Sequence, residues 1–264
     1  MKHTYLLSLI CLMLCPALLL SCGTEKQDRQ IIEEYVGPLN AEYARLSENT
    51  DLLESVAVEL SDNNLAVEVV FAGDEVAVPD LTEALVQYGV AFWLKEHTGK
   101  RLDNILNALG RLQGSLELTL KDANADERTY SISSSRLKQL VRLRPMELNF
   151  NEVKANISAI MSSRCGDLRA KANGCEGATF AITGGFAQYT LSFGRAADYR
   201  EFTQASLAGK YVNLLKPQYE GYGELRPFVQ NILESLQIEG YRFIYEAGNG
   251  GTPLRAAIPW RLLN

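Results

Sequence analysis

The feature that most limits the fold of this chain is a series of strand and helix patterns that occurs twice in the same order. Segments 81–95 (LTEALVQYGVAFWLK) and 202–216 (FTQASLAGKYVNLLK) align with an offset of 121 residues, and four identical pairs fall within them. The same offset places Gly73 on Gly194, each of which follows a predicted strand pair. Because self-similarity at a fixed spacing is the mark of a repeat, we expect two related units of about 110–120 residues.

The first half contains the patterns of two helices between two pairs of strands. Val56, Val58 and Leu60 alternate with polar or small residues, Asp62-Asn63-Asn64 supplies a turn, and 65–71 forms the return strand. Apolar residues at helical spacing follow in 81–95 and 102–112, and two further strands are predicted at 116–120 and around Tyr130.

The second half repeats this order after a helix around 153–161. Its hairpin turns at Gly184-Gly185, and its remaining helices and strands are predicted at 202–216, 224–236, 241–245 and 254–260. Each repeat therefore reads α-β-β-α-α-β-β, which predicts an α+β fold with a four-stranded antiparallel sheet and helices on one face. We place the first repeat at 31–143 and the second at 144–264, with a groove between them as the default ligand site.

Local signals set the expected helix boundaries. Gly37-Pro38 predicts a break between two N-terminal helices, and Pro217 with Gly221 predicts a break in the second repeat. Asp80 with Glu83, and Asp198 with Glu201, fit capping boxes. In 136–145 (RLKQLVRLRP) basic and apolar residues alternate, which predicts an amphipathic connector with solvated charges.

Composition excludes one class of partner. The 264-residue chain is 47% hydrophobic and 22% charged, with a formal net charge of −6. Proteins that bind nucleic acid through its phosphates need clustered Lys and Arg. The acidic balance therefore argues against a nucleic-acid partner.

The N-terminus has the layout of a secretory signal. Lys2 and His3 precede an almost wholly apolar run from Tyr5 to Leu20. As a transmembrane helix this run is at the short limit for crossing about 30 Å of hydrocarbon, and Pro16 interrupts it. We therefore favour a signal segment over a retained helix.

The end of that run, Leu19-Leu20-Ser21-Cys22, resembles the lipobox of bacterial lipoproteins. The resemblance implies removal of residues 1–21 as a signal peptide and acylation of Cys22, with 22–30 as a lipidated tether. It implies an envelope protein attached to a membrane by lipid, which we place at the outer membrane facing the periplasm, with exposure on the cell surface left open. The rest of the chain resembles no characterised family.

Cleavage there would remove Cys11 and Cys15, so that Cys165 and Cys175 become the remaining unmodified cysteines. In an oxidising envelope two cysteines this close in sequence favour a disulfide, with two free thiols as the alternative. His97 is the only histidine after the signal segment, so we expect no metal site.

No motif for nucleophilic catalysis or cofactor binding is present, and we expect no cofactor. Paired carboxylates of a hydrolase stay open as an alternative, because sequence does not place two carboxylates across a cleft. Tyr241, Phe243 and Tyr245 alternate as core residues would, whereas Tyr219 and Tyr222 lie near a linker and are the candidate ligand-binding residues.

Together these observations predict an envelope lipoprotein that acts as a binding or scaffolding module rather than an enzyme. The partner would be a protein, peptide or glycan, held in the groove between repeats or on an open sheet face. The alternatives are a carboxylate-pair hydrolase of an envelope polymer and a structural assembly subunit that exposes a sheet edge.

Overall fold

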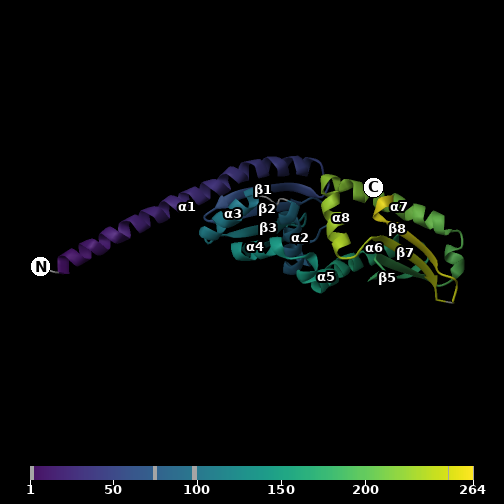
Figure 1. The fold of residues 1–264 in the computed structure, drawn as a ribbon. Helices are drawn as coiled ribbons and strands as arrows, with labels where there is room; N and C mark the ends of the chain where they lie inside the picture. Colours follow the sequence, from purple (N-terminus) through teal and green to yellow (C-terminus); the bar gives the residue numbers. More distant parts are fainter. Residues whose placement is uncertain (1–2, 74–75, 97–99, 249, 264) are drawn as a thin grey trace.

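A computed structural model folds the chain into two α+β units that follow one another along the molecule, each with a four-stranded sheet (Figure 1). The structure describes residues 3–73, 76–96, 100–248 and 250–263, and describes side chains for 24–73, 76–95, 101–248 and 250–263.

Within the described residues, the first unit contains four α-helices, one 3-10 turn and four strands. In chain order they are α1 (His3–Glu48), β1 (Leu53–Ser61), β2 (Asn64–Phe71), the 3-10 turn η1 (Val78–Asp80), α2 (Glu83–Glu96), α3 (Lys100–Arg111), β3 (Ser115–Lys121), β4 (Glu127–Ser133) and α4 (Ser134–Arg142). In α4 the predicted amphipathic pattern is present, because Leu137 and Leu140 are buried, but only Arg142 of its three basic residues is exposed, whereas Arg136 and Lys138 are half-buried.

The second unit follows after a short 3-10 turn (Pro145–Glu147). Its main elements are α5 (Phe150–Ser163), α6 (Cys165–Ala170), β5 (Cys175–Thr183), β6 (Phe186–Phe193), the 3-10 turn η3 (Ala196–Tyr199), α7 (Gln204–Gly221), α8 (Arg226–Ser235), β7 (Gly240–Ala247), β8 (Leu254–Pro259) and the 3-10 turn η5 (Trp260–Leu262). The repeated order α-β-β-α-α-β-β is thus present, with α4 and α6 as additions.

The prediction of fully antiparallel sheets is wrong. The strand orders are β1-β2-β3-β4 and β5-β6-β7-β8, and in each the outer pairs are antiparallel while the central pair, β2 with β3 or β6 with β7, is parallel. Two helices separate the central strands in each unit. They return the chain to the end of the sheet where the previous strand began, and the next strand therefore runs in the same direction.

The two first hairpins correspond residue by residue. The closing pairs of their two-residue turns are Ser61 with Asn64 and Thr183 with Phe186, an offset of 122. The register shift that marks a bulge lies between Leu53 and Ser55 in β1 and between Cys175 and Gly177 in β5, at the same offset. Two sheets with one strand order and one bulge position are consistent with a duplication.

Each sheet has one covered and one open face. In the first, the covered face carries Val58, Leu116 and Ile132, which are buried against the helices. The open face of the second carries the row Ala181, Gln188, Arg242 and Ala257, none of which is buried. This alternation is what a strand with one solvated face requires.

The predicted break at Gly37-Pro38 does not occur, because α1 continues through both residues to Glu48. One side of the helix is fixed to the first sheet and to α3 by the buried side chains of Ile32, Tyr35, Leu39 and Tyr43. Packing of this amphipathic face holds the helix together across a residue that favours a break. Similarly, α7 continues through Pro217 and ends at Gly221.

The predicted capping boxes are also wrong. The hydroxyl of Thr203 accepts from Ser206 N–H at 3.1 Å and caps α7, and Thr82 accepts from Leu85 N–H at 3.3 Å at the start of α2. Asp198 belongs to η3, where its carboxylate accepts from the Arg195 N–H. Threonine caps at two positions of the aligned segments add a further likeness between the units.

The predicted tether 22–30 lies within α1, and the contacts of its last residues tie it to the first unit. Asp28 is 4% exposed and accepts three hydrogen bonds from the guanidinium of Arg111, two from Nε and one from Nη2. The neighbouring Arg29 donates to Asn63 in the β1–β2 turn at 3.1 Å. Thr24 to Gln27 are exposed, so packing against the unit begins at Asp28.

Candidate functional site

The region between the two units, where a ligand groove was expected, is crossed by direct contacts. At one side the turn after α7 lies on the end of α1 and the start of β1. Asp51 N–H donates to the Gly221 carbonyl at 2.7 Å, and the Arg45 guanidinium pairs with Glu224 at 2.8 Å. Gly223 has φ +51°, and a Cβ there would fall 1.7 Å from the Asn49 carbonyl oxygen, so this approach requires glycine.

At the other side of the junction, α2 contacts α5 and α8. The hydroxyls of Tyr88 and Ser235 are 2.8 Å apart. Asn156 bridges to the first unit through both atoms of its amide: Oδ1 accepts from Thr82 Oγ1 at 3.0 Å and Nδ2 donates to the Asp80 carbonyl at 3.1 Å. Side chains from α2, α5 and α8 therefore join the units directly.

Of the candidate ligand-binding residues, Tyr222 lies beside Gly221 at this junction, whereas the contacts of Tyr219 are within the second unit. Tyr219 is 4% exposed, its ring is stacked on Trp260 with centroids 6.0 Å apart, and its hydroxyl donates to Gln230 at 2.8 Å. Tyr222 is half-buried, and its ring meets Tyr219 edge-on at 5.9 Å. The Tyr219 ring and hydroxyl are thus both used in contacts within the protein, and burial raises its pKa.

The prediction that the strand rings build the core is confirmed for Phe243 and Tyr245, each 1% exposed. Phe243 stacks on Tyr211 with a centroid separation of 3.5 Å. The hydroxyls of Tyr211 and Tyr245 are 3.0 Å apart, and Lys210 donates to Tyr245 at 3.1 Å. Burial raises the pKa of Tyr211, so its hydroxyl stays protonated and the rings form a packed part of the second unit.

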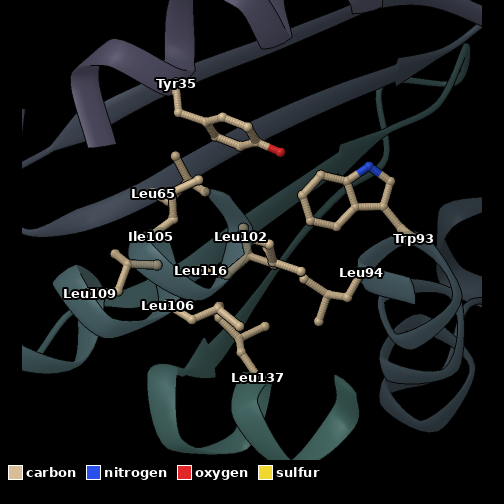
Figure 2. Close-up of a pocket in the computed structure, with 10 residues that line it drawn as sticks. All are labelled: Tyr35, Leu65, Trp93, Leu94, Leu102, Ile105, Leu106, Leu109, Leu116 and Leu137. Carbon is tan, nitrogen blue, oxygen red and sulfur yellow. The ribbon is translucent and has the colours of Figure 1, made fainter. Parts of the chain in front are cut away.

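A cavity of about 10 Å³ lies in the first unit between the sheet and the helices α1, α2, α3 and α4 (Figure 2). Its ten lining residues are Tyr35, Leu65, Trp93, Leu94, Leu102, Ile105, Leu106, Leu109, Leu116 and Leu137. A space of this size holds about one water, and an apolar lining keeps such a space dry. The cavity is therefore a packing gap and too small for a ligand.

Cys165 opens α6 and Cys175 opens β5, and both are half-buried free thiols in the structure. The Cys175 Sγ lies 3.1 Å from the Gly177 carbonyl oxygen. Burial raises the pKa of both thiols, which favours the unreactive protonated form. The disulfide between them stays a prediction.

Two other predicted positions are outside the described side chains: Cys22, the proposed site of acylation, and His97. Within the side chains that are described, no three His, Cys, Asp or Glu residues come together in an arrangement suited to a metal ion. In the same part of the chain, no helix combines the length and apolar character needed to cross a membrane.

The open face of the first sheet is the most strongly charged surface feature built by the strands. Four glutamates and one lysine lie on it among hydroxyl side chains. Lys121 pairs with Glu68 at 2.6 Å and with Glu127 at 3.6 Å, whereas Glu117 accepts from Asn64 at 2.8 Å and Glu59 is exposed. The hydroxyls on this face are those of Ser55, Ser61, Ser115, Thr119, Thr129, Ser131 and Ser133.

The open face of the second sheet has a different character. Arg242 lies over the Phe186 ring at 4.4 Å and donates to Gln188 at 3.4 Å. Arg255 is exposed on β8, and Glu246 accepts from Ser192 at 3.2 Å. Two arginines against one glutamate make this face basic, whereas the face of the first sheet is acidic. Sequence alternation could have located both faces, but the parallel central pair decides which residues are neighbours.

Comparison with known proteins gives no relative for this chain: no family model, no curated protein and no solved structure matches it.

Proposed function

We propose that this protein is a lipid-anchored scaffold of the bacterial envelope that binds a polar partner on the open faces of its sheets. The observation that carries the proposal is the pair of four-stranded faces left without helical cover, one acidic and one basic. A solvated face alone does not indicate binding, because sheets that bind no partner also leave one face open to water. What favours binding here is the separation of charge, with glutamates on one unit and arginines on the other.

The position of α1 suits an anchor at Cys22. Five residues separate Cys22 from Asp28, where packing against the first unit begins. Those six steps span about 9 Å as a helix and at most about 22 Å when extended. An acylated Cys22 would therefore hold the first unit close to the membrane, with the second unit further away (Figure 1).

Binding rather than catalysis is favoured by where the carboxylates lie. Glu59, Glu68, Glu117 and Glu127 are spread over a solvated sheet face. Hydrolysis by a carboxylate pair needs two groups held on either side of a scissile bond. A flat face with hydroxyls and carboxylates instead suits hydrogen bonding to an extended protein, peptide or glycan.

Site-specific photocrosslinking in the intact envelope tests this proposal. A photoreactive residue would replace Thr129 on the first open face or Ala257 on the second, and Gln139 on α4 or Glu152 on α5 as exposed helical controls. We expect adducts of defined mass at the two open-face positions and not at the controls. Equal adducts at all four positions, or none at the open faces, would contradict the proposal.

A further inference from the structure

The first strand of the first unit, β1, and the first strand of the second unit, β5, differ in how their outer edges are protected. β1 and β5 are both edge strands of their sheets. The backbone of Val58 in β1 is bonded by the amide of Asn40 from α1: Val58 N–H donates to Oδ1 at 2.8 Å, and Nδ2 donates to the Val58 carbonyl at 2.7 Å. An amide side chain thus takes the place that a neighbouring strand would occupy.

The equivalent residue of β5 is Phe180. Val58 lies three residues before Ser61, the closing residue of its hairpin, and Phe180 lies three residues before Thr183, the closing residue of the other. Alternate residues of an antiparallel strand direct their N–H and C=O groups to opposite sides. Since the groups of Val58 point away from β2, those of Ala178, Phe180 and Ile182 point away from β6.

Those outward groups of β5 have no partner in the part of the chain that the structure describes. None of the hydrogen bonds made by turns, loops or side chains there reaches the backbone of Ala178, Phe180 or Ile182. Since backbone groups of native proteins are almost always paired with protein or water, this edge is open to water or to another strand. The side chains of Phe180 and Ile182 are only half-buried.

β5 has a bulge between Cys175 and Gly177 and is contacted by α5 and α6, but the rest of the strand lacks the charges and the proline that usually protect an edge. It is nine residues long, contains no proline, and has Glu176 as its only charged residue. By comparison, β8 is six residues long and carries Arg255 and Pro259, and β4 carries Glu127 and Arg128. Long uncharged edges are those to which a further strand adds.

From this geometry we infer that β5 pairs with β5 of a second copy of the chain and forms an antiparallel, twofold-symmetric dimer. A second copy fits because residues 177–183 (GATFAIT) carry no charge that would repel an identical strand. The register that pairs all three outward residues sets Phe180 opposite Phe180 of the second copy, so that two half-buried rings cover one another. This inference goes beyond the proposed function and does not require the lipid anchor.

That register places Thr179 opposite Ala181 of the second copy, on the open face. Both are exposed, and their Cβ atoms would be about 4.5–5.5 Å apart. The full chain with Thr179→Cys and Ala181→Cys is therefore expected to form a reducible dimer under mild oxidation. The matched control is Ala57→Cys with Glu59→Cys at the equivalent exposed positions of β1, where Asn40 protects the edge; unsubstituted chain gives the background from the native cysteines.

The inference is supported if the β5 cysteine variant forms more dimer than both the β1 control and the unsubstituted chain. An amount of dimer no greater than that of the β1 control overturns it, and so does a reducible adduct with a different protein.

A charge test gives a second, independent measurement by sedimentation of the full chain. T179K/A181K sets lysine opposite lysine and is expected to lose the dimer, whereas T179K/A181E sets lysine opposite glutamate and is expected to keep it. Equal masses for these two variants would contradict the inference.

Discussion

The guanidinium of Arg101 on α3 donates from Nη2 to the Glu34 carbonyl on α1 at 3.3 Å. In an α-helix each N–H donates to the carbonyl four residues earlier. The Glu34 carbonyl would therefore accept from an N–H at position 38, which is Pro38. Proline has no N–H, and Arg101 supplies the missing donor from a neighbouring helix. The same guanidinium lies over the Tyr35 ring at 4.9 Å.

Pro38→Ala is expected to stabilise the protein. Alanine restores the N–H and removes the ring from the helix interior, which should raise the free energy of unfolding by about 1–2 kcal/mol after the greater freedom of the unfolded chain is included. Urea denaturation measures the change. A lower stability for Pro38→Ala would mean that the proline is favourable where it stands.

Arg101→Ala tests the donor itself. In the natural sequence, loss of the Arg101 guanidinium should lower the free energy of unfolding by about 0.5–1.5 kcal/mol. In the Pro38→Ala background the decrease should be smaller, because the backbone then supplies a donor to Glu34. The double-mutant cycle isolates this difference. An identical cost in both backgrounds would show that the Arg101 contribution comes from its contact with Tyr35.

Asn40→Ala is expected to leave the outward N–H and C=O groups of Val58 without partners. Val58 is 3% exposed, so the loss should lower the free energy of unfolding by about 1–3 kcal/mol. Asn49→Ala is the matched control, since Asn49 is exposed and bonds mainly within the end of its own helix. If the two variants were equally stable, the Asn40 amide would have no special role at the β1 edge.

Asp122 gives the protein a predicted sensitivity to acid. Its carboxylate accepts from the N–H groups of Val78 at 2.8 Å, Asn124 at 2.9 Å and Asp126 at 3.1 Å. These bonds, that of Val78 foremost, lower the pKa of Asp122. The folded state therefore binds this proton less readily than the unfolded state, and the stability present above about pH 4 is lost as the pH falls below it.

Asp122→Asn removes that titration. The variant should be less stable than the natural protein at neutral pH, because one amide oxygen replaces two carboxylate oxygens, and should lose less stability on acidification. Urea midpoints measured between about pH 6 and pH 3 compare the two. Parallel pH profiles would show that other groups control unfolding in acid.

The cysteine pair is tested by mass. If Cys165 and Cys175 are joined in the envelope, the non-reduced mature protein is two hydrogen atoms lighter than the reduced protein, and the closed loop contributes about 2–3 kcal/mol to the free energy of unfolding. A full-mass product isolated with thiols blocked during lysis would leave both cysteines free, as they are in the structure.

Local patterns predicted what depends on neighbours in sequence. Alternation located the hairpins around Val58 and Phe180, Gly184-Gly185 gave a turn, and apolar spacing located α2 and α3. The repeat offset of 121 is close to the 122 by which the hairpins correspond in space. These features follow from side-chain periodicity and from residues that favour turns.

What the sequence did not predict depends on distant contacts. The helix continues through Pro38 because Arg101 and the first sheet support it, and neither is adjacent in sequence. Tyr219 is buried because Trp260, near the C-terminus, stacks on it. Antiparallel and parallel pairing give the same alternation within a strand, so the direction of β3 and β7 was not readable from periodicity.

Labelling with a radioactive fatty acid tests whether this protein is held at a membrane by lipid on Cys22. Cells producing the full chain or its Cys22→Ala variant would be grown with labelled palmitate, and each protein would be isolated and counted. We expect label in the natural protein and none in Cys22→Ala. Equal labelling of the two, or no label in either, would show that Cys22 does not carry the lipid.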